Sequence, residues 1–143
     1  MPAAEVTIRN LRLYFAYTLP ANLFYLNRYA ALVARLLAEK NFQCPGYHHL
    51  CISIAGTREI ALKHALVVED WYTFGVAVLE EKALKNAGFD EQQSLVLQAI
   101  KEGLLVIAER DGLDKAIIND AIEEAGKIGV QEEILFKAMT LPR

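Results

Sequence analysis

The chain has 143 residues, of which 54% are hydrophobic and 23% are charged, and its formal net charge is −3. This composition is typical of one globular domain spanning residues 1–143, and with only two cysteines and four prolines it excludes a disordered chain and a disulfide scaffold. The N-terminus lacks a basic segment followed by an apolar run, and no apolar run reaches the ~18 residues that a membrane span needs. We therefore expect a cytoplasmic protein without a membrane partner.

Charge is distributed unevenly along the chain. Residues 1–79 contain seven Lys and Arg against five Asp and Glu, whereas residues 80–143 contain eight against thirteen. Nucleic-acid binding requires clustered positive charge, so we expect no nucleic-acid partner. The acidic half would attract a basic protein, although a helical surface that is merely rich in glutamate is an alternative. We assign this acidic contact surface to Asp120, Glu123, Glu124, Glu132 and Glu133.

Alternating apolar residues predict a first strand over Val6–Tyr17. The alternation changes phase near Asn10, which indicates a bulge or a late strand start. A helix that ends near Lys40–Asn41 is predicted next, because one apolar stripe repeats every three or four residues through Leu23, Leu26, Ala30, Val33 and Leu37. A second strand follows over residues 48–55 and is closed by a Gly-Thr pair.

The segment Ile60–Phe74 fits either a strand or a short helix. We favour a third strand around Ala65–Tyr72, because valine and aromatic residues favour the β conformation. This strand would form a hairpin with the second one. We expect the core to include Phe15, Val68 and Phe74. One or two exposed rings are expected among Tyr47, Trp71 and Tyr72.

Beyond Val76 the pattern is helical, and two glycine junctions divide it. They read Gly88-Phe89-Asp90 and Gly112-Leu113-Asp114. In each junction the glycine permits a left-handed helix end, and the aspartate is placed to cap the next helix. Asp90 and Gln93 also form a predicted capping box.

The second half of the chain is predicted to form a helical bundle. Apolar residues occupy most of residues 91–110, so this helix should be central and nearly surrounded. The next helix should end at Gly126 and Gly129, before a short last helix over residues 131–139. The predicted fold is α+β: a small sheet of about three strands in the N-terminal half with one inserted helix, packed on a C-terminal bundle of three to four helices.

The polar residues form no motif for metal binding or catalysis. Cys44, His48, His49 and Cys51 lack the paired spacing of a zinc site, so we expect no metal and no cofactor. Cys51 with a histidine base would be a nucleophile, but its position between two apolar residues favours packing in the core. A disulfide between Cys44 and Cys51 is disfavoured in a reducing cytosol. Because serine-nucleophile and phosphate-loop motifs are also absent from the sequence, we expect no enzyme.

An aromatic cluster is a candidate for a recognition surface, because tryptophan and tyrosine dominate binding hot spots. It consists of Trp71-Tyr72-Thr73-Phe74 with Tyr14, Phe15 and Tyr17, and we select Trp71 and Tyr72 as its contact residues. The alternative is that these rings form a core between the sheet and the helices.

Five segments together resemble a bacterial polymorphic-toxin immunity protein, the kind encoded beside contact-dependent growth-inhibition toxins. They are the strand through residues 11–15, the helix opened by 23–26, the strand ending at 52–54, the aromatic stretch 70–74 and the helix through 104–114. The likeness spans most of the chain and concerns the order of these segments and the pattern of residue types within them. The resemblance implies a non-enzymatic protein that binds a cognate toxin domain, often a basic nuclease, and blocks its active site or the approach of its substrate.

We therefore expect a monomer or weak dimer that neutralises a basic toxin domain by stoichiometric binding through its acidic surface, with Trp71 and Tyr72 also in contact. Two alternatives stay open. The first is a small enzyme or ligand-binding domain with a pocket between sheet and helices. The second is a homo-oligomeric structural or regulatory subunit that pairs through its first helix.

Overall fold

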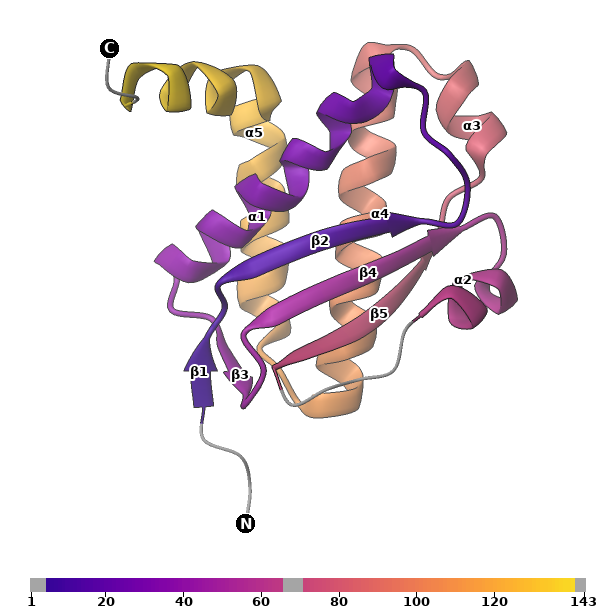
Figure 1. Ribbon diagram of the computed structural model, residues 1–143. Helices are drawn as coiled ribbons and strands as arrows, with labels where there is room; N and C mark the ends of the chain where they lie inside the picture. Colours follow the sequence, from indigo (N-terminus) through magenta and orange to yellow (C-terminus); the bar gives the residue numbers. More distant parts are fainter. Residues whose placement is uncertain (1–4, 66–70, 141–143) are drawn as a thin grey trace.

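Figure 1 shows the computed structural model, which describes residues 5–65 and 71–140, with the backbone alone from residue 130 onward. The fold is α+β, as the sequence predicts, with small sheets in the N-terminal half and helices in the C-terminal half. In chain order the described strands are β1 (Glu5–Thr7), β2 (Asn10–Phe15), β3 (Gln43–Pro45), β4 (His49–Ala55) and β5 (Tyr72–Val78).

The strands form two sheets. β1 pairs with β3 in an antiparallel ribbon, while β2, β4 and β5 form a parallel sheet in the spatial order β2-β4-β5. The predicted first strand is therefore two strands, and the phase change near Asn10 marks the point where the chain passes from one sheet to the other. The main sheet provides the platform on which the helices pack.

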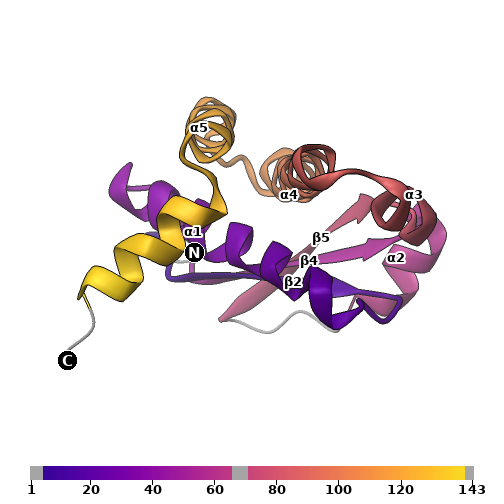
Figure 2. The ribbon, with the colours of Figure 1, turned by 90° about the horizontal axis from the view of Figure 1, so that it is seen from above.

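The helices lie mostly on one face of this sheet. They are η1 (Ala21–Asn27), α1 (Arg28–Glu39), α2 (Arg58–His64), α3 (Glu81–Asn86), α4 (Phe89–Asp111) and α5 (Lys115–Thr140). α1 and α4 pack directly on the sheet, and α5 packs against both of them in an outer layer (Figure 2). The predicted stripe of the first helix faces the core, since Leu23, Leu26, Ala30, Val33 and Leu37 are all buried.

The prediction of a hairpin after β4 is wrong. The third strand of the parallel sheet is β5, and the preceding segment Arg58–His64 forms α2. Thr57 caps this helix by accepting a hydrogen bond from the Ile60 amide, and the last turn carries Lys63 and His64, which favour a helix C-terminus. Parallel neighbours need a crossover connection, which α2 supplies. The rest of the predicted strand, with Val68, lies outside the described residues.

Of the two predicted glycine junctions, one is confirmed and one is wrong. Gly112 adopts the left-handed conformation, with φ of 70°, and Asp114 accepts hydrogen bonds from two amides of the first turn of α5. Gly88 has φ of −72° and precedes the first residue of α4. Asp90 therefore lies inside the helix and forms no capping box, because the chain between α3 and α4 is extended.

The predicted break in the last helix occurs at only one of its two glycines. Gly129 has φ of 78° and interrupts the helical geometry of α5, whereas Gly126 lies within the regular helix. A positive φ is accessible to glycine at little cost, which explains the kink at Gly129.

Two other glycines bring α4 unusually close to the sheet. A Cβ built on Gly75 of β5 would lie 2.9 Å from the Gly103 carbonyl carbon, and one built on Gly103 would lie 2.5 Å from the Cγ2 atom of Ile52. Only residues without a side chain allow this approach. The face of the sheet that α4 covers is therefore closed and tightly packed.

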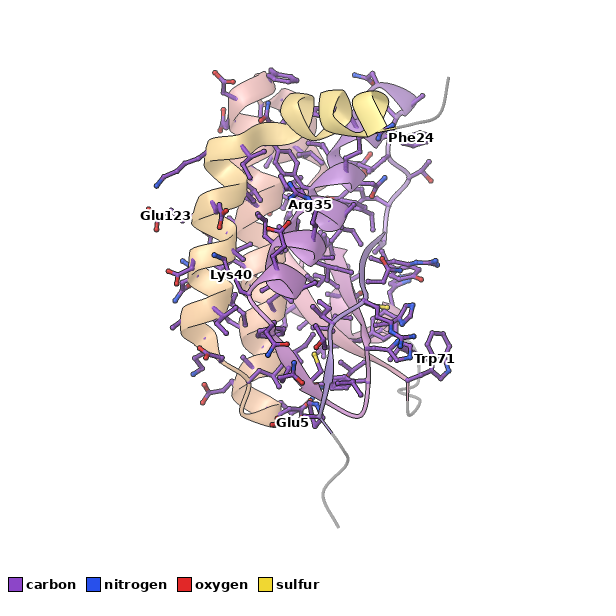
Figure 3. All side chains as sticks on the ribbon, turned by 90° about the vertical axis from the view of Figure 1, so that its left-hand side faces the viewer. Glu5, Phe24, Arg35, Lys40, Trp71 and Glu123 are labelled. Carbon is purple, nitrogen blue, oxygen red and sulfur yellow. The ribbon has the colours of Figure 1, made fainter. Side chains whose placement is uncertain are left out.

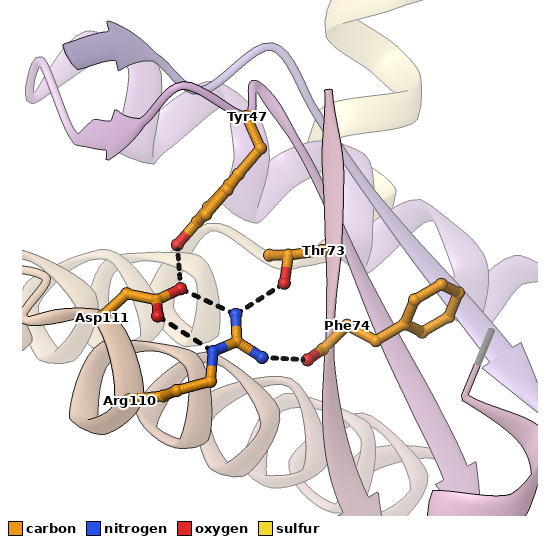
Figure 4. A network of polar contacts seen from close by, with 5 residues as sticks. All are labelled: Tyr47, Thr73, Phe74, Arg110 and Asp111. Carbon is orange, nitrogen blue, oxygen red and sulfur yellow. Dashed lines mark hydrogen bonds and ion pairs between the residues drawn. The ribbon is translucent and has the colours of Figure 1, made fainter. Parts of the chain in front are cut away.

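A polar network joins the end of α4 to β5 and to the loop after β3 (Figure 4). Arg110 donates to both carboxylate oxygens of Asp111, to the Thr73 hydroxyl and, over 3.1 Å, to the Phe74 carbonyl. The Tyr47 hydroxyl donates to Asp111 over 2.7 Å. These bonds raise the pKa of Arg110 and hold the pKa of Asp111 below its usual range, mainly through the Arg110–Asp111 hydrogen bonds.

Candidate partner-binding surface

The described residues leave one face of the parallel sheet largely uncovered, and we call it the open face. It points toward the viewer in Figure 1, opposite the face that carries α1 and α4. Only its far end is closed, where Ser53 donates a 2.7 Å hydrogen bond to the Ala61 carbonyl and Ala61 packs beside Val76. Successive side chains of a strand point to opposite faces. The open face therefore carries Arg12 and Tyr14 of β2, His49 and Cys51 of β4, and Tyr72 and Phe74 of β5.

The register of the strands sets these side chains side by side. Arg12, Cys51 and Phe74 form one row across the sheet, and Tyr14 lies one row further along β2. Together with Trp71, which precedes β5, they surround a hollow of about 280 Å³. A hollow of this volume can take one or two side chains of another molecule.

Aromatic rings follow one another across the open face. The centroid of Trp71 lies 5.4 Å from His49 and 4.6 Å from Tyr72. Phe74 continues the series at 5.9 Å from Tyr72, and Tyr14 ends it at 5.6 Å from Phe74. Such rings combine a large apolar area with few rotatable bonds, so they contribute strongly to binding when a partner covers them.

The polar groups of the hollow are cationic or neutral. Burial, with help from His48, Arg12 and Arg9, lowers the pKa of His49, so the imidazole is neutral at pH 7. Burial also raises the pKa of the Cys51 thiol, and the nearby Arg12 guanidinium offsets this only in part. The thiol is therefore the stable form at neutral pH, whereas nucleophilic attack requires the thiolate. The arrangement suits contact with another surface better than covalent chemistry.

The predicted contact residues lie on two separate sides of the molecule (Figure 3). Trp71 is 53% exposed and belongs to the open face, where Tyr72 is half-buried. Glu123 lies on the far side, on α5. It pairs with Lys127 over 3.5 Å, and Glu124, on the same helix, pairs with Lys40 over 2.9 Å.

The rest of the acidic prediction is only partly described. Asp120 is exposed on α5 and lines a shallow depression with these ion pairs. The side chains of Glu132 and Glu133 lie outside the described part of the structure. Because Glu123 and Glu124 already contact lysines, this side is less negative than a count of acidic residues implies.

Sequence reasoning identified part of the open face and missed the rest. Phe74 is buried as predicted, although it lies under the hollow, and Tyr47 is buried in the polar network. Phe15 is only half-buried. Tyr14 was predicted only as a member of the aromatic cluster and not as a contact residue, and Arg12 was not predicted as a site residue. The available signal was their place in the polar phase of the first strand, opposite the buried Leu11.

The described residues contain no group of three or more His, Cys, Asp and Glu side chains that could hold a metal ion. Cys44 and Cys51 are both free thiols. The rings of His48 and His49 are in contact, with centroids 4.5 Å apart, because His48 precedes the strand. No helix in the described ranges is long and apolar enough to cross a membrane.

Comparison with known proteins identifies no relative of this chain. The sequence matches no family model, no curated protein and no solved structure at a significant level.

Proposed function

We propose that this chain is a non-enzymatic binding protein that neutralises a toxin domain by stoichiometric binding, and that the toxin seats on the open face. The observation that carries the proposal is the exposure of Trp71, 53% of whose surface is free at the end of a continuous series of rings. An uncovered aromatic surface of this kind marks an interaction site in a soluble domain. The toxin as partner class follows from the resemblance to immunity proteins.

The composition of the hollow supports a protein partner. Its lining combines one tryptophan, two tyrosines and one arginine, the three residue types that are most enriched in binding hot spots. At about 280 Å³ the hollow is slightly smaller than the range of about 300–1,000 Å³ that is usual for small-molecule sites. A protein partner that covers the hollow would exclude water from Trp71 and Tyr14, which is 39% exposed.

The acidic surface on α5 is the second candidate contact. It lies opposite the open face, so one compact partner domain cannot cover both. The open face is rich in aromatic rings, whereas the α5 side carries exposed ion pairs. We favour the open face as the centre of the contact, because fully desolvated aromatic groups contribute more affinity than exposed ion pairs.

Co-expression with the products of the adjacent genes tests the proposal. We expect one of these products to arrest bacterial growth and the chain to restore it by forming a one-to-one complex. Trp71→Ala should weaken the complex by about 2 kcal/mol or more, as expected for a hot-spot residue, which corresponds to roughly 30-fold in the dissociation constant.

Two variants serve as matched controls. Phe24 is 56% exposed on η1 and lies well above Trp71 in Figure 3, so Phe24→Ala should leave affinity and growth rescue unchanged. Glu123→Lys reverses a charge on the acidic side. Loss of rescue in Glu123→Lys with full rescue in Trp71→Ala would refute the open face and support the acidic surface. If no adjacent product is toxic or bound, the proposed function itself is wrong.

A further inference from the structure

The two outer edges of the parallel sheet differ in how their backbone groups are satisfied. In β5, alternate residues direct their amides and carbonyls away from β4. Two of these outward groups are capped by side chains of α4: the Phe74 carbonyl accepts from Arg110 over 3.1 Å, and the Val78 amide donates to Glu102 over 2.8 Å. Such caps block the addition of another strand.

The β2 edge lacks this protection. Backbone bonds to β4 come from the even-numbered residues of β2, so Leu11, Leu13 and Phe15 direct their amides and carbonyls outward. The Leu11 amide donates to the side chain of Asn10. In the described part of the chain no strand pairs with this edge, and no side chain bonds to the backbone of Leu13 or Phe15.

There is also room beside this edge. A hollow of about 320 Å³ runs along it, bounded on one side by Leu11–Tyr14 and on the other by Asn27 and Ala30. The strand contains no lysine, proline or bulge, and Arg12 is its one charged residue. An edge with so few of the devices that block pairing can accept another strand.

We propose that a second copy of this chain pairs antiparallel with β2, with the two-fold axis passing Leu13. The two Leu13 residues would then exchange backbone hydrogen bonds, and Leu11 of one copy would face Phe15 of the other. This inference does not rest on the proposed function, although Arg12 and Tyr14, which the dimer would pair, also line the hollow of the open face.

Side-chain chemistry selects this register among the alternatives. It sets Arg12 of each copy opposite Tyr14 of the other on the open side of the sheet, a cation–π pair that occurs twice. Moving the axis to Arg12 would oppose two like charges, which is destabilising. Moving it to Tyr14 would lose both cation–π pairs and shorten the overlap. The two parallel sheets would join into one, with both open faces on the same side.

Sedimentation at increasing protein concentration tests the dimer, with two variants at one position. Leu13→Pro removes an outward amide that the fold itself does not use, and proline is tolerated at such edge positions. Leu13→Ala removes the same side chain and keeps the amide. We expect Leu13→Pro to raise the dimer dissociation constant by at least about tenfold relative to Leu13→Ala, since backbone hydrogen bonds are lost. Circular dichroism confirms that both variants stay folded.

Disulfide trapping tests the register. Cys51 faces Arg12 within one copy, so the experiment uses a Cys51→Ser background. Arg12→Cys and Tyr14→Cys chains should cross-link when mixed, and neither should cross-link efficiently alone, because only unlike positions lie opposite each other. A wild-type chain that stays monomeric at all concentrations would overturn the proposal. Equal dimerisation of both Leu13 variants, or cross-linking of Arg12→Cys alone, would overturn it as well.

Discussion

Substitution of Gly75 by alanine probes the close approach of α4 to the sheet. The added Cβ would lie 2.9 Å from the Gly103 carbonyl carbon and 3.0 Å from an Ile107 side-chain carbon. Because one of these neighbours is backbone, no change of rotamer relieves the clash, and α4 must move away from β5 by roughly 0.5–1 Å. A gap of that size forfeits about a quarter to a half of each dispersion contact across the interface.

We expect Gly75→Ala to lower the free energy of unfolding by about 3 kcal/mol, the upper end for overpacked cores. In a domain of this size the midpoint of thermal unfolding should fall by roughly 6–12 °C. Urea and thermal unfolding followed by circular dichroism measure both values. Gly126→Ala is the control: among the described side chains its Cβ meets only Leu97, at 3.7 Å, within a regular helix, so it should stabilise by about 0.5–1 kcal/mol. Wild-type stability in Gly75→Ala would refute the close packing.

Three further predictions concern the polar network and the Cys44 thiol. Tyr47→Phe removes the hydroxyl that donates to Asp111 and should cost about 1.5–3 kcal/mol in urea unfolding, since the acceptor is charged. The pKa of Asp111 is lowered in the folded state, so its contribution is present above the unfolded pKa and is lost as pH falls through the folded value; stability should decline more steeply with acid in the wild type than in Asp111→Asn. Burial raises the pKa of Cys44 to about 12, so an aromatic disulfide reagent at neutral pH should react with Cys44 in a Cys51→Ser chain only as fast as the native state opens; rapid reaction would contradict the burial of Cys44.

The fold class follows from the sequence because its strongest signals are local. The apolar stripe of α1, the long apolar run of α4 and the Gly112-Leu113-Asp114 junction each act within a few residues, and each is confirmed. At Gly88 the local pattern does not produce the predicted junction. The same three-residue pattern there begins a helix without a left-handed turn, because the preceding helix already ends at Asn86 and Ala87 is extended.

The arrangement of the sheet depends on contacts that are distant in sequence. The segment Arg58–His64 fits both a helical and an extended pattern. Its cap at Thr57 favours the helix, but this cap can form only because β4 ends before Thr57. The parallel direction of β4 and β5 follows from that helix, since it supplies the crossover that a parallel pair needs.

The open face was equally hard to predict. Parallel sheets usually have both faces covered, so aromatic residues near Trp71 also fit a core. Alternation separates the two faces of β2 but does not say which one a helix covers. That choice depends on α4, which approaches through Gly103 and closes the opposite face.

Trp71 is the only tryptophan of the chain, so its fluorescence reports directly on the open face. Titration with the toxic product of the adjacent gene, combined with iodide quenching, therefore tests the central claim most directly. We expect the emission to shift to shorter wavelength and quenching to fall as the one-to-one complex forms, because the partner removes water from the ring. A complex of full affinity in which the emission and quenching of Trp71 stay unchanged would contradict the claim.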